Sequence, residues 1–212
     1  MPNRLAVVIP AYRPSEGLIN LVRNLTEGRI GEVVVVDDGS GPDYRDIFAQ
    51  LSALPKVHLL RHGAHLGRGA ALKTAFNHVL CTIPDLAGVV TVDTEGNNDP
   101  DHIERVAAKL MEQPDALVLG ARAAETGMPL RRRFGNFVSR GLLRGLLGRR
   151  FADTQTELRG IPARLLPRLL RIEANGREFE YAMLIATHQL AMPVIEERIE
   201  SAYRRDDARS RR

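Results

Sequence analysis

Two apolar, mostly β-branched runs that end abruptly in acidic residues constrain the fold of this chain most strongly. Residues 33–36 read Val-Val-Val-Val before Asp37 and Asp38, and residues 89–92 read Val-Val-Thr-Val before Asp93. Continuous runs of this kind are typical of strands buried on both faces, as in parallel sheets covered by helices. Ligands bind at the carboxyl ends of such strands, so we predict that these acids lie at a binding edge.

Strand and helix patterns alternate along the first 120 residues. Strands are predicted at 5–9, 32–36, 57–60, 89–92 and 116–119, and helices at about 16–25, 47–51, 68–80 and 101–111. This alternation is typical of a parallel sheet with crossover helices. We therefore predict an α/β fold with a central, mainly parallel, Rossmann-like sheet flanked by helices, and a lobe added from about residue 122 onward.

The composition indicates an ordinary globular chain. With 212 residues and 44% hydrophobic residues, it suits one domain with a substantial core. The single cysteine, Cys81, excludes an internal disulfide, fits a reducing compartment and has apolar neighbours, which predict a buried thiol without a catalytic role. No stretch approaches the roughly 18 apolar residues of a membrane span, and residues 1–10 are too weakly apolar for a secretory signal. We expect a cytoplasmic protein.

The acids after residues 89–92 have spacing that suits a metal site. Asp93 and Glu95 stand two residues apart and Asp99 follows. From a strand-to-loop transition, two such acids can converge on one hard divalent cation. A solvated turn is the alternative, because clusters of Asp, Asn and Gly are also typical of turns. Local sequence leaves both interpretations open.

A glycine-rich loop precedes the helix at about 68–80. Gly67 and Gly69 form Gly-x-Gly, but the third glycine of a dinucleotide fingerprint would fall at Leu72, and the phosphate-loop pattern is absent. What remains is a helix N-terminus whose N–H groups and dipole favour an anion, with Arg68 or Lys73 as charge partner. Close packing of helix on strand is the alternative explanation for the glycines.

Residues 131–150 form a basic amphipathic segment. They contain seven arginines and no acid, and helical spacing places Phe134, Val138, Leu142 and Leu146 on one side. Such a helix can pack on the sheet or lie in an anionic membrane surface, and an ordinary helix with a solvated basic face is the alternative. Nucleic acid is a poor partner, because only 5% of residues are aromatic and the segment lacks a stacking platform.

Several longer motifs occur in a fixed order along the chain. Those of the first half are Val-Val-Ile-Pro-Ala-Tyr at 7–12, Val-Val-Val-Val-Asp-Asp-Gly-Ser at 33–40, His-Leu-Gly-Arg-Gly-Ala-Ala-Leu at 65–72 and Asp-Thr-Glu-Gly-Asn-Asn-Asp-Pro at 93–100, and those of the second half lie at 129–136, 153–159, 178–181 and 202–204. Their order and spacing resemble those of the family 2 glycosyltransferases, which are inverting, nucleotide-sugar-dependent enzymes of the A-type fold. The later segments resemble the branch that transfers sugars to polyprenyl phosphates, of the dolichyl-phosphate mannose synthase type. The likeness covers nearly the whole chain.

The resemblance implies a donor site at the loops that end the first strands. Asp38 would accept hydrogen bonds from base or ribose, although such acids are otherwise turn formers. The residues implied to contact the substrates on this side are Pro10, Ala11, Tyr12, Asp37, Asp38, Ser40, Gly67, Gly69, Asn97 and Arg122.

Asp93 and Glu95 match the family's Asp-x-Asp element, which implies a bound Mg²⁺ or Mn²⁺ that neutralises the departing diphosphate. Here the second acid is a glutamate. Its extra methylene keeps the charge but moves it by about a bond length, so we expect effects on metal preference and rate more than on metal binding. His65 stands where the family often has Asn, and Asn97 where it often has Gln.

The resemblance also implies an acceptor site in the second half. Arg131, Arg132 and Arg133 would contact the acceptor, with residues 142–147 as a lipid-facing stripe. Gln155 and the catalytic candidate Asp153 resemble family positions near the phosphates, as does Arg204. Asp153 could instead cap a helix, and Arg204 could form a surface salt bridge.

These implications combine into one functional prediction. We predict a single domain, residues 1–212, with a nucleotide-sugar-binding half at 1–120 and an acceptor-binding half at 121–212, that transfers a sugar to a polyprenyl phosphate. Two alternatives stay open: transfer to a soluble or protein acceptor, and a catalytically weak nucleotide-sugar-binding module, suggested by Glu95. We expect peripheral attachment to the cytoplasmic face of an anionic membrane, with a membrane-protein partner or self-association left open.

Overall fold

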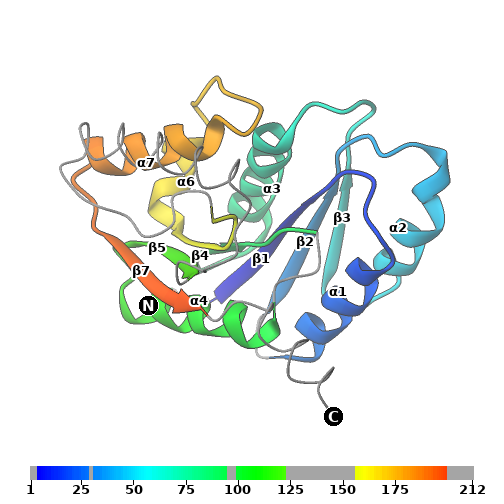
Figure 1. Ribbon diagram of the computed structural model, residues 1–212, viewed down its shortest axis with the longest axis horizontal. Helices are drawn as coiled ribbons and strands as arrows, with labels where there is room; N and C mark the ends of the chain where they lie inside the picture. Colours follow the sequence, from blue (N-terminus) through cyan, green and yellow to red (C-terminus); the bar gives the residue numbers. More distant parts are fainter. Residues whose placement is uncertain (1–3, 29–30, 95–98, 123–155, 200–212) are drawn as a thin grey trace, which may run out of the picture.

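The fold is built on one seven-stranded, mainly parallel sheet, which confirms the predicted α/β class. The computed structural model describes residues 4–28, 31–94, 99–122 and 156–199. The strand order is β3-β2-β1-β4-β6-β5-β7, and β6 runs antiparallel to both of its neighbours (Figure 1). The strands are β1 (Arg4–Ala11), β2 (Glu32–Asp37), β3 (Val57–Arg61), β4 (Leu86–Thr91), β5 (Leu117–Arg122), β6 (Arg159–Pro162) and β7 (Val194–Ile199).

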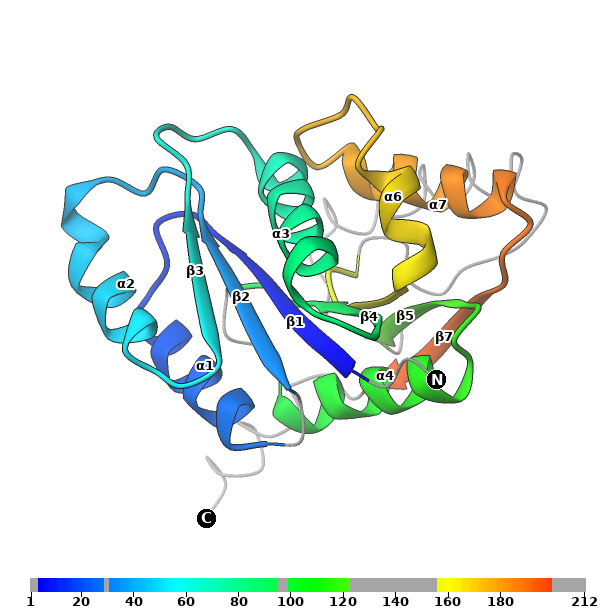
Figure 2. The same ribbon diagram turned by 180° about the vertical axis from the view of Figure 1, so that it is seen from behind.

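Helices cover both faces of the sheet. One face is covered by α1 (Gly17–Glu27), α2 (Arg45–Ser52) and α4 (Pro100–Glu112), and the other by α3 (Arg68–Thr82), α6 (Leu166–Leu169) and α7 (Phe179–Gln189). The two layers are visible from opposite sides in Figures 1 and 2. Short 3₁₀ turns at Pro42–Tyr44 and Ala163–Leu165 precede α2 and α6.

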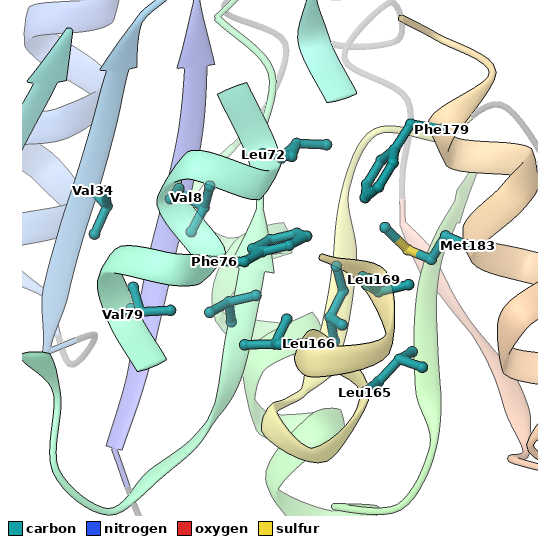
Figure 3. Close-up of a cluster of buried hydrophobic side chains, with 14 of the residues drawn as sticks. Val8, Val34, Leu72, Phe76, Val79, Leu165, Leu166, Leu169, Phe179 and Met183 are labelled. Carbon is teal, nitrogen blue, oxygen red and sulfur yellow. The ribbon is translucent and has the colours of Figure 1, made fainter. Parts of the chain in front are cut away.

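The continuous apolar run of β2 follows from burial on both faces. Val33 and Val35 belong to the core under α1, α2 and α4, whereas Val34 and Val36 belong to the core under α3, α6 and α7. Successive side chains of a strand point to opposite faces, so each face needs its own apolar set. Figure 3 shows the second core, in which Phe76 of α3 faces the α6 and α7 side chains.

The carboxyl ends of β1, β2 and β4 meet at one edge of the sheet. The predicted strand at 5–9 in fact continues through Pro10 to Ala11. Beyond Val8, β1 is paired with β2 and no longer with β4, so Pro10 occupies a local edge where its missing N–H is tolerated. Asp93 follows the last residue of β4 by two positions, as the sequence pattern predicts.

Two strands of the second half complete this sheet. β6 inserts between β4 and β5, and β7 pairs in parallel with β5. The sequence did not predict β6, because four residues reading Arg-Gly-Ile-Pro carry no strand periodicity. The two predicted halves therefore share one sheet, while the single-domain boundary at 1–212 stays a prediction.

Cys81 corrects a prediction, because its thiol is exposed rather than buried. The buried stripe of α3 runs through Leu72, Ala75, Phe76 and Val79, and Cys81 lies off that stripe in the last turn of the helix. Of its apolar neighbours in sequence, Val79 is buried, whereas Leu80 is itself 37% exposed. None of the helices within the described ranges is both long and apolar enough to cross a membrane.

Candidate functional site

The carboxylate of Asp38, directly after β2, organises the first part of the site. Its Oδ1 accepts a hydrogen bond from Leu66 N at 2.9 Å and lies 2.7 Å from His62 Nδ1. Its Oδ2 accepts from Gly67 N at 2.9 Å and lies 2.8 Å from His65 Nδ1. A carboxylate has about four acceptor positions, and these contacts use all of them. Asp38 would need to lose one of these partners to contact a nucleoside, so that role stays a prediction.

His62 extends this cluster to helix α3. Because a carboxylate only accepts hydrogen bonds, the Nδ1 of His62 carries the proton that faces Asp38. The Nε2 of His62 lies 2.9 Å from Thr74 Oγ1, which can then donate to it. Strand β2, the loop after β3 and helix α3 are thereby joined through one buried imidazole.

The loops after β1, β2 and β3 also interlock. Asp37 Oδ1 accepts a hydrogen bond from Ser40 N at 2.9 Å, and Ser40 Oγ accepts from Arg13 N at 2.9 Å. Gly39 has φ +71°, and a Cβ there would lie 2.3 Å from the carbonyl carbon of Ala64. Only glycine allows this close approach, so the three loops form one rigid edge.

An aromatic platform stands on this edge. The rings of Tyr12 and His65 stack with their centroids 4.0 Å apart and 28° between their planes. The guanidinium of Arg13 lies 5.1 Å from the centroid of the Tyr12 ring. Tyr12 is 39% exposed and the His65 side chain 50% exposed, so the platform faces solvent where a ligand can reach it.

A second cluster centres on Arg68, at the start of α3. Its Nε donates to Glu180 Oε1 at 2.8 Å, and its Nη1 lies 3.5 Å from Glu157 Oε2. Its Nη2 is buried without a hydrogen-bond partner. Burial by itself lowers the pKa of Arg68, but the nearby carboxylates of Glu157 and Glu180 raise it above its ordinary value.

Glu157 lies beside Asp93, just before β6. Burial raises the pKa of Glu157 to about 7, Arg68 opposes that rise, and a hydrogen bond and charge repulsion from Asp93 add to it. The Oε2 atom of Glu157 is buried and has no hydrogen-bond partner.

Arg159 ties this cluster to α7. Its side chain is 1% exposed, its Nε donates to Thr156 O at 2.9 Å, and its Nη1 donates to Glu180 O at 2.9 Å. Its Nη2 lies 3.6 Å from Glu180 Oε2. The cluster therefore joins the end of β4, the start of β6 and the first turns of α3 and α7.

The glycines at the start of α3 have a packing role in the structure. A Cβ on Gly67 would lie 2.7 Å from Asn175 O, and a Cβ on Gly69 would lie 2.7 Å from the Cβ of Phe179. Lys73 Nζ donates to Ile172 O at 2.7 Å. These contacts support the close-packing alternative, although it is packing against the 172–179 segment rather than against a strand. Anion binding by Gly67 and Gly69 stays a prediction.

Several predicted site residues converge and others fall outside the described ranges. The carboxyl edge of the sheet and the adjoining start of α3 bring together Pro10, Ala11, Tyr12, Asp37, Asp38, Ser40, Gly67, Gly69 and Asp93. Arg122 ends β5, but its side chain is not described. Outside the described residues lie Glu95, Asn97, Arg131, Arg132, Arg133, Asp153, Gln155 and Arg204.

The sequence interpretation missed four participants: His62, Glu157, Arg159 and Glu180. Each forms an interaction with a partner distant in sequence, such as Arg68 with Glu180. The only local signal was the presence of charged residues inside two of the resembling segments, 153–159 and 178–181.

The metal prediction is covered by the structure only in part. Within residues 4–28, 31–94, 99–122 and 156–199, no group of three or more His, Cys, Asp or Glu side chains is arranged to hold a metal ion. Asp93 and Glu157 contribute a pair of carboxyl groups in contact. Oxygen donors of this type suit Mg²⁺ or Mn²⁺, so the donor set fits such a cation.

Comparison with known sequences assigns the class. Residues 6–168 match the sequence profile "Glycosyl transferase family 2", and the chain belongs to that family. This confirms the resemblance drawn from the motifs.

Several known proteins are similar to this chain. The chain is 26% identical over 192 residues to the UDP-N-acetylglucosamine–dolichyl-phosphate N-acetylglucosaminyltransferase of Methanococcus voltae, covering 82% of this chain and 75% of that protein. It is 26% identical over 175 residues to the undecaprenyl-phosphate 4-deoxy-4-formamido-L-arabinose transferase of Salmonella paratyphi B, and the match covers 79% of this chain and 51% of that protein. An uncharacterised Methanocaldococcus jannaschii protein is 28% identical over 162 residues, and the match covers 74% of this chain and 64% of that protein. The chain thus spans less than two thirds of two of these relatives.

A solved structure has the same fold. Glucosyl-3-phosphoglycerate synthase from Mycobacterium tuberculosis, in complex with Mn²⁺, uridine diphosphate and phosphoglyceric acid, superposes with a TM-score of 0.71 at 20% identity. The match covers 93% of this chain and 69% of the synthase. This likeness shows the glycosyltransferase A-type arrangement of the sheet and its helices.

Proposed function

We propose that this protein is an inverting glycosyltransferase that transfers a sugar from a nucleotide-sugar donor to a polyprenyl phosphate. Family membership supports the reaction type. The Methanococcus voltae and Salmonella relatives, named for dolichyl-phosphate and undecaprenyl-phosphate, support the acceptor class. The structural observation that carries the proposal is the convergence of an exposed aromatic platform and the Asp93 carboxyl group at one sheet edge.

The platform of Tyr12 and His65 gives the donor its first contact. Flat aromatic surfaces stack on a planar base in offset geometry. Asp38 holds His65 at 2.8 Å, which orients one ring of the platform. In this proposal Pro10, Ala11, Asp37 and Ser40 shape the walls of the nucleoside site, and Asp38 acts mainly by positioning.

The metal would be held by Asp93 and Glu95. When bound, Mg²⁺ or Mn²⁺ supplies positive charge against the departing nucleoside diphosphate. The Asp93 carboxyl group fits this role because it follows β4 and already touches a second carboxyl group. The Mycobacterium tuberculosis synthase is named with Mn²⁺ and Mg²⁺ complexes, which supports the same choice of ions.

The acceptor chemistry needs no strong base. A phosphate monoester has a second pKa of about 6, so its oxygen is largely ionised at neutral pH. That oxygen forms a bond to the anomeric carbon as the bond from this carbon to the diphosphate oxygen breaks. Positioning and charge neutralisation supply most of the catalysis. We assign contacts with the acceptor and donor phosphates to Gly67, Gly69, Asn97, Arg122, Arg131, Arg132, Arg133, Asp153, Gln155 and Arg204.

The experiment that tests the proposal measures donor binding and then transfer. Thermal stabilisation by a panel of nucleotide sugars, each with Mn²⁺, Mg²⁺ or chelator, identifies the donor, because a ligand that binds only the folded state raises Tm. That donor is then offered to polyprenyl phosphate, to soluble phosphorylated acceptors and to protein acceptors. Transfer only to a soluble or protein acceptor would replace the acceptor assignment. A metal-dependent shift without transfer would favour a binding module, and no shift with any donor would mean that the donor site is lost.

A single substitution tests the metal pair. Glu95→Gln is expected to keep the fold and abolish metal-dependent turnover, because the amide removes the anionic ligand. Glu112→Gln, on the exposed surface of α4, is the matched control and should turn over normally. Full activity of Glu95→Gln would contradict the site assignment.

Membrane attachment has a separate test. The basic segment at 131–150 should bind anionic liposomes at low salt, with binding that weakens as salt rises. Neutral liposomes of the same lipid chain length are the control. Absence of binding to anionic liposomes at low salt would contradict a membrane role for this segment.

A further inference from the structure

We propose that Glu157 is a ligand of the divalent cation, beside Asp93 at the end of β4. The inference rests on the proposed function, because it adds a residue to the metal site of that reaction. It differs from the sequence prediction, which takes both protein ligands from the Asp-x-Glu segment after one strand.

Strand register places the two carboxyl groups together. In the antiparallel pair of β4 and β6, Thr91 stands opposite Arg159, and Thr91 Oγ1 donates to Glu157 O at 2.8 Å. Two residues further along each segment, Asp93 comes opposite Glu157. Residues two apart share a face, and opposed side chains have Cβ atoms about 5 Å apart. The register therefore brings the two carboxyl groups to the same face at the end of this strand pair.

One oxygen of Glu157 is left without a donor. Its Oε2 is buried and has no hydrogen-bond partner. The Arg68 Nη1 atom lies 3.5 Å away, beyond the roughly 2.7–2.9 Å of a charge-assisted hydrogen bond, because Arg68 directs its Nε to Glu180 at 2.8 Å. A buried acceptor without a donor is destabilising, because it loses its hydrogen bond to water and gains none in the protein. A cation between Asp93 and Glu157 would satisfy this oxygen.

The charges of the cluster favour a cation as well. Its described side chains are two guanidinium groups, Arg68 and Arg159, and three carboxyl groups, Asp93, Glu157 and Glu180. When all five side chains are ionised, the three negative charges exceed the two positive charges by one. Mg²⁺ commonly takes one or two protein carboxylates and completes its shell with phosphate oxygens and water. The buried Nη2 of Arg68 also has no hydrogen-bond partner, so in this proposal it would donate to the diphosphate that binds with the ion.

The competing explanation is that Glu157 serves only to hold Arg68. Both explanations predict that substitution changes stability, so stability does not separate them. Affinity for the metal does, because an ion-pair partner of Arg68 has no direct bond to the cation. If Glu157 serves only to hold Arg68, Arg68→Gln should weaken Mn²⁺ binding as much as Glu157→Gln does; if Glu157 is a ligand, only Glu157→Gln should weaken it, because a guanidinium group cannot bind a cation.

The test is calorimetric titration of the full chain with MnCl₂, alone and with uridine diphosphate. Glu157→Gln is expected to weaken Mn²⁺ binding by at least about tenfold, whereas Glu178→Gln, an exposed acid whose Oε1 accepts from Gly176 N, should bind as the unaltered chain does. Gln has the shape of protonated Glu157, so the variant should fold, and circular dichroism checks this. Unchanged Mn²⁺ affinity in folded Glu157→Gln would overturn the inference.

Two further outcomes separate this inference from the proposed function. If the unaltered chain binds no Mn²⁺ under either condition but transfers sugar in chelator, the metal role of Glu157 is overturned and the transferase survives. If Mn²⁺ binding falls in Glu157→Gln but no acceptor is glycosylated, the inference holds and the transferase proposal fails.

Discussion

Two carboxylates at the same sheet edge, Asp38 after β2 and Glu157 before β6, have opposite surroundings. Asp38 is 2% exposed and has four partners, two backbone N–H groups and two imidazoles. Glu157 is also mostly buried, yet one of its oxygens has no hydrogen-bond partner and its pKa rises to about 7. A saturated carboxylate stabilises the loops around it, whereas an unsaturated one retains capacity for a ligand.

The comparison shows that the two clusters at this edge have different roles. The Asp38 cluster fixes the loops that present Tyr12 and His65, and its contacts are complete without a ligand. The Arg68 and Glu157 cluster holds two buried atoms without hydrogen-bond partners. Natural proteins leave few such atoms, and in the proposed function these two lie where the metal ion and the diphosphate would bind.

The largest expected effect on stability concerns Gly39, in the interlocked loops after β1, β2 and β3. Gly39→Ala should lower the free energy of unfolding by about 4 kcal/mol, because the new Cβ meets the Ala64 backbone at 2.3 Å and φ is +71°. Gly41→Ala is the matched control: φ is +94° but nothing lies within 4 Å, so only about 1 kcal/mol is expected. Urea denaturation measures both. Equal losses would show that the loops do not interlock as described.

The next largest effect on stability concerns the cluster of Arg68, Glu157 and Glu180. Arg68→Ala should cost about 3 kcal/mol, because Glu157 and Glu180 lose their shared cation in a mostly buried place. Arg105→Ala removes an ion pair with Glu197 in which Arg105 is half exposed, and should cost less than about 1 kcal/mol. Thermal unfolding of both variants at equal salt makes the comparison. A small loss for Arg68→Ala would mean that solvent enters the cluster.

A pH series tests the raised pKa of Glu157 directly. Its folded pKa of about 7 exceeds the ordinary value of 4.5, so the native state binds the extra proton between those values. The stability that this group contributes is present below about pH 4.5 and is lost as pH rises through 7. Without metal at pH 8, Glu157→Gln should therefore be more stable than the unaltered chain by about 1–2 kcal/mol.

The control for this series is Glu178→Gln. A backbone N–H bond lowers the pKa of Glu178, which is fully exposed, so its substitution should not produce a gain at pH 8. The difference between Glu157→Gln and the unaltered chain should shrink from pH 8 to pH 5. A constant difference across this range would show that Glu157 has an ordinary pKa.

The smallest expected effect on stability concerns the histidines that contact Asp38. His65→Ala should cost about 1 kcal/mol, because it removes one of four Asp38 contacts and the stack on Tyr12. His62→Ala should cost more, since this ring is buried and bridges Asp38 to Thr74. Chemical denaturation ranks the two. A larger loss for His65→Ala would reverse the roles assigned to the buried and exposed imidazoles.

Much of the first half, residues 1–120, was predictable from sequence because its signals are local. Apolar runs of four or more residues, acids at their ends and glycines at turns identify β1, β2 and β4 and place Asp38 and Asp93 at one edge. Cys81 shows the limit, since its side-chain direction depends on the turn of α3 that faces the sheet. The site residues outside the described ranges stay predictions.

The sequence by itself determined the α/β class, the mainly parallel character of the sheet and the family, because each depends on periodicity or on short motifs. Only the tertiary structure decided that β6 lies between β4 and β5, which sets Glu157 opposite Asp93 across 64 residues of sequence. It also decided that Asp38 is saturated, through donors from the 62–67 loop. Register and hydrogen-bond partners depend on which distant segments meet, and no local pattern encodes that meeting.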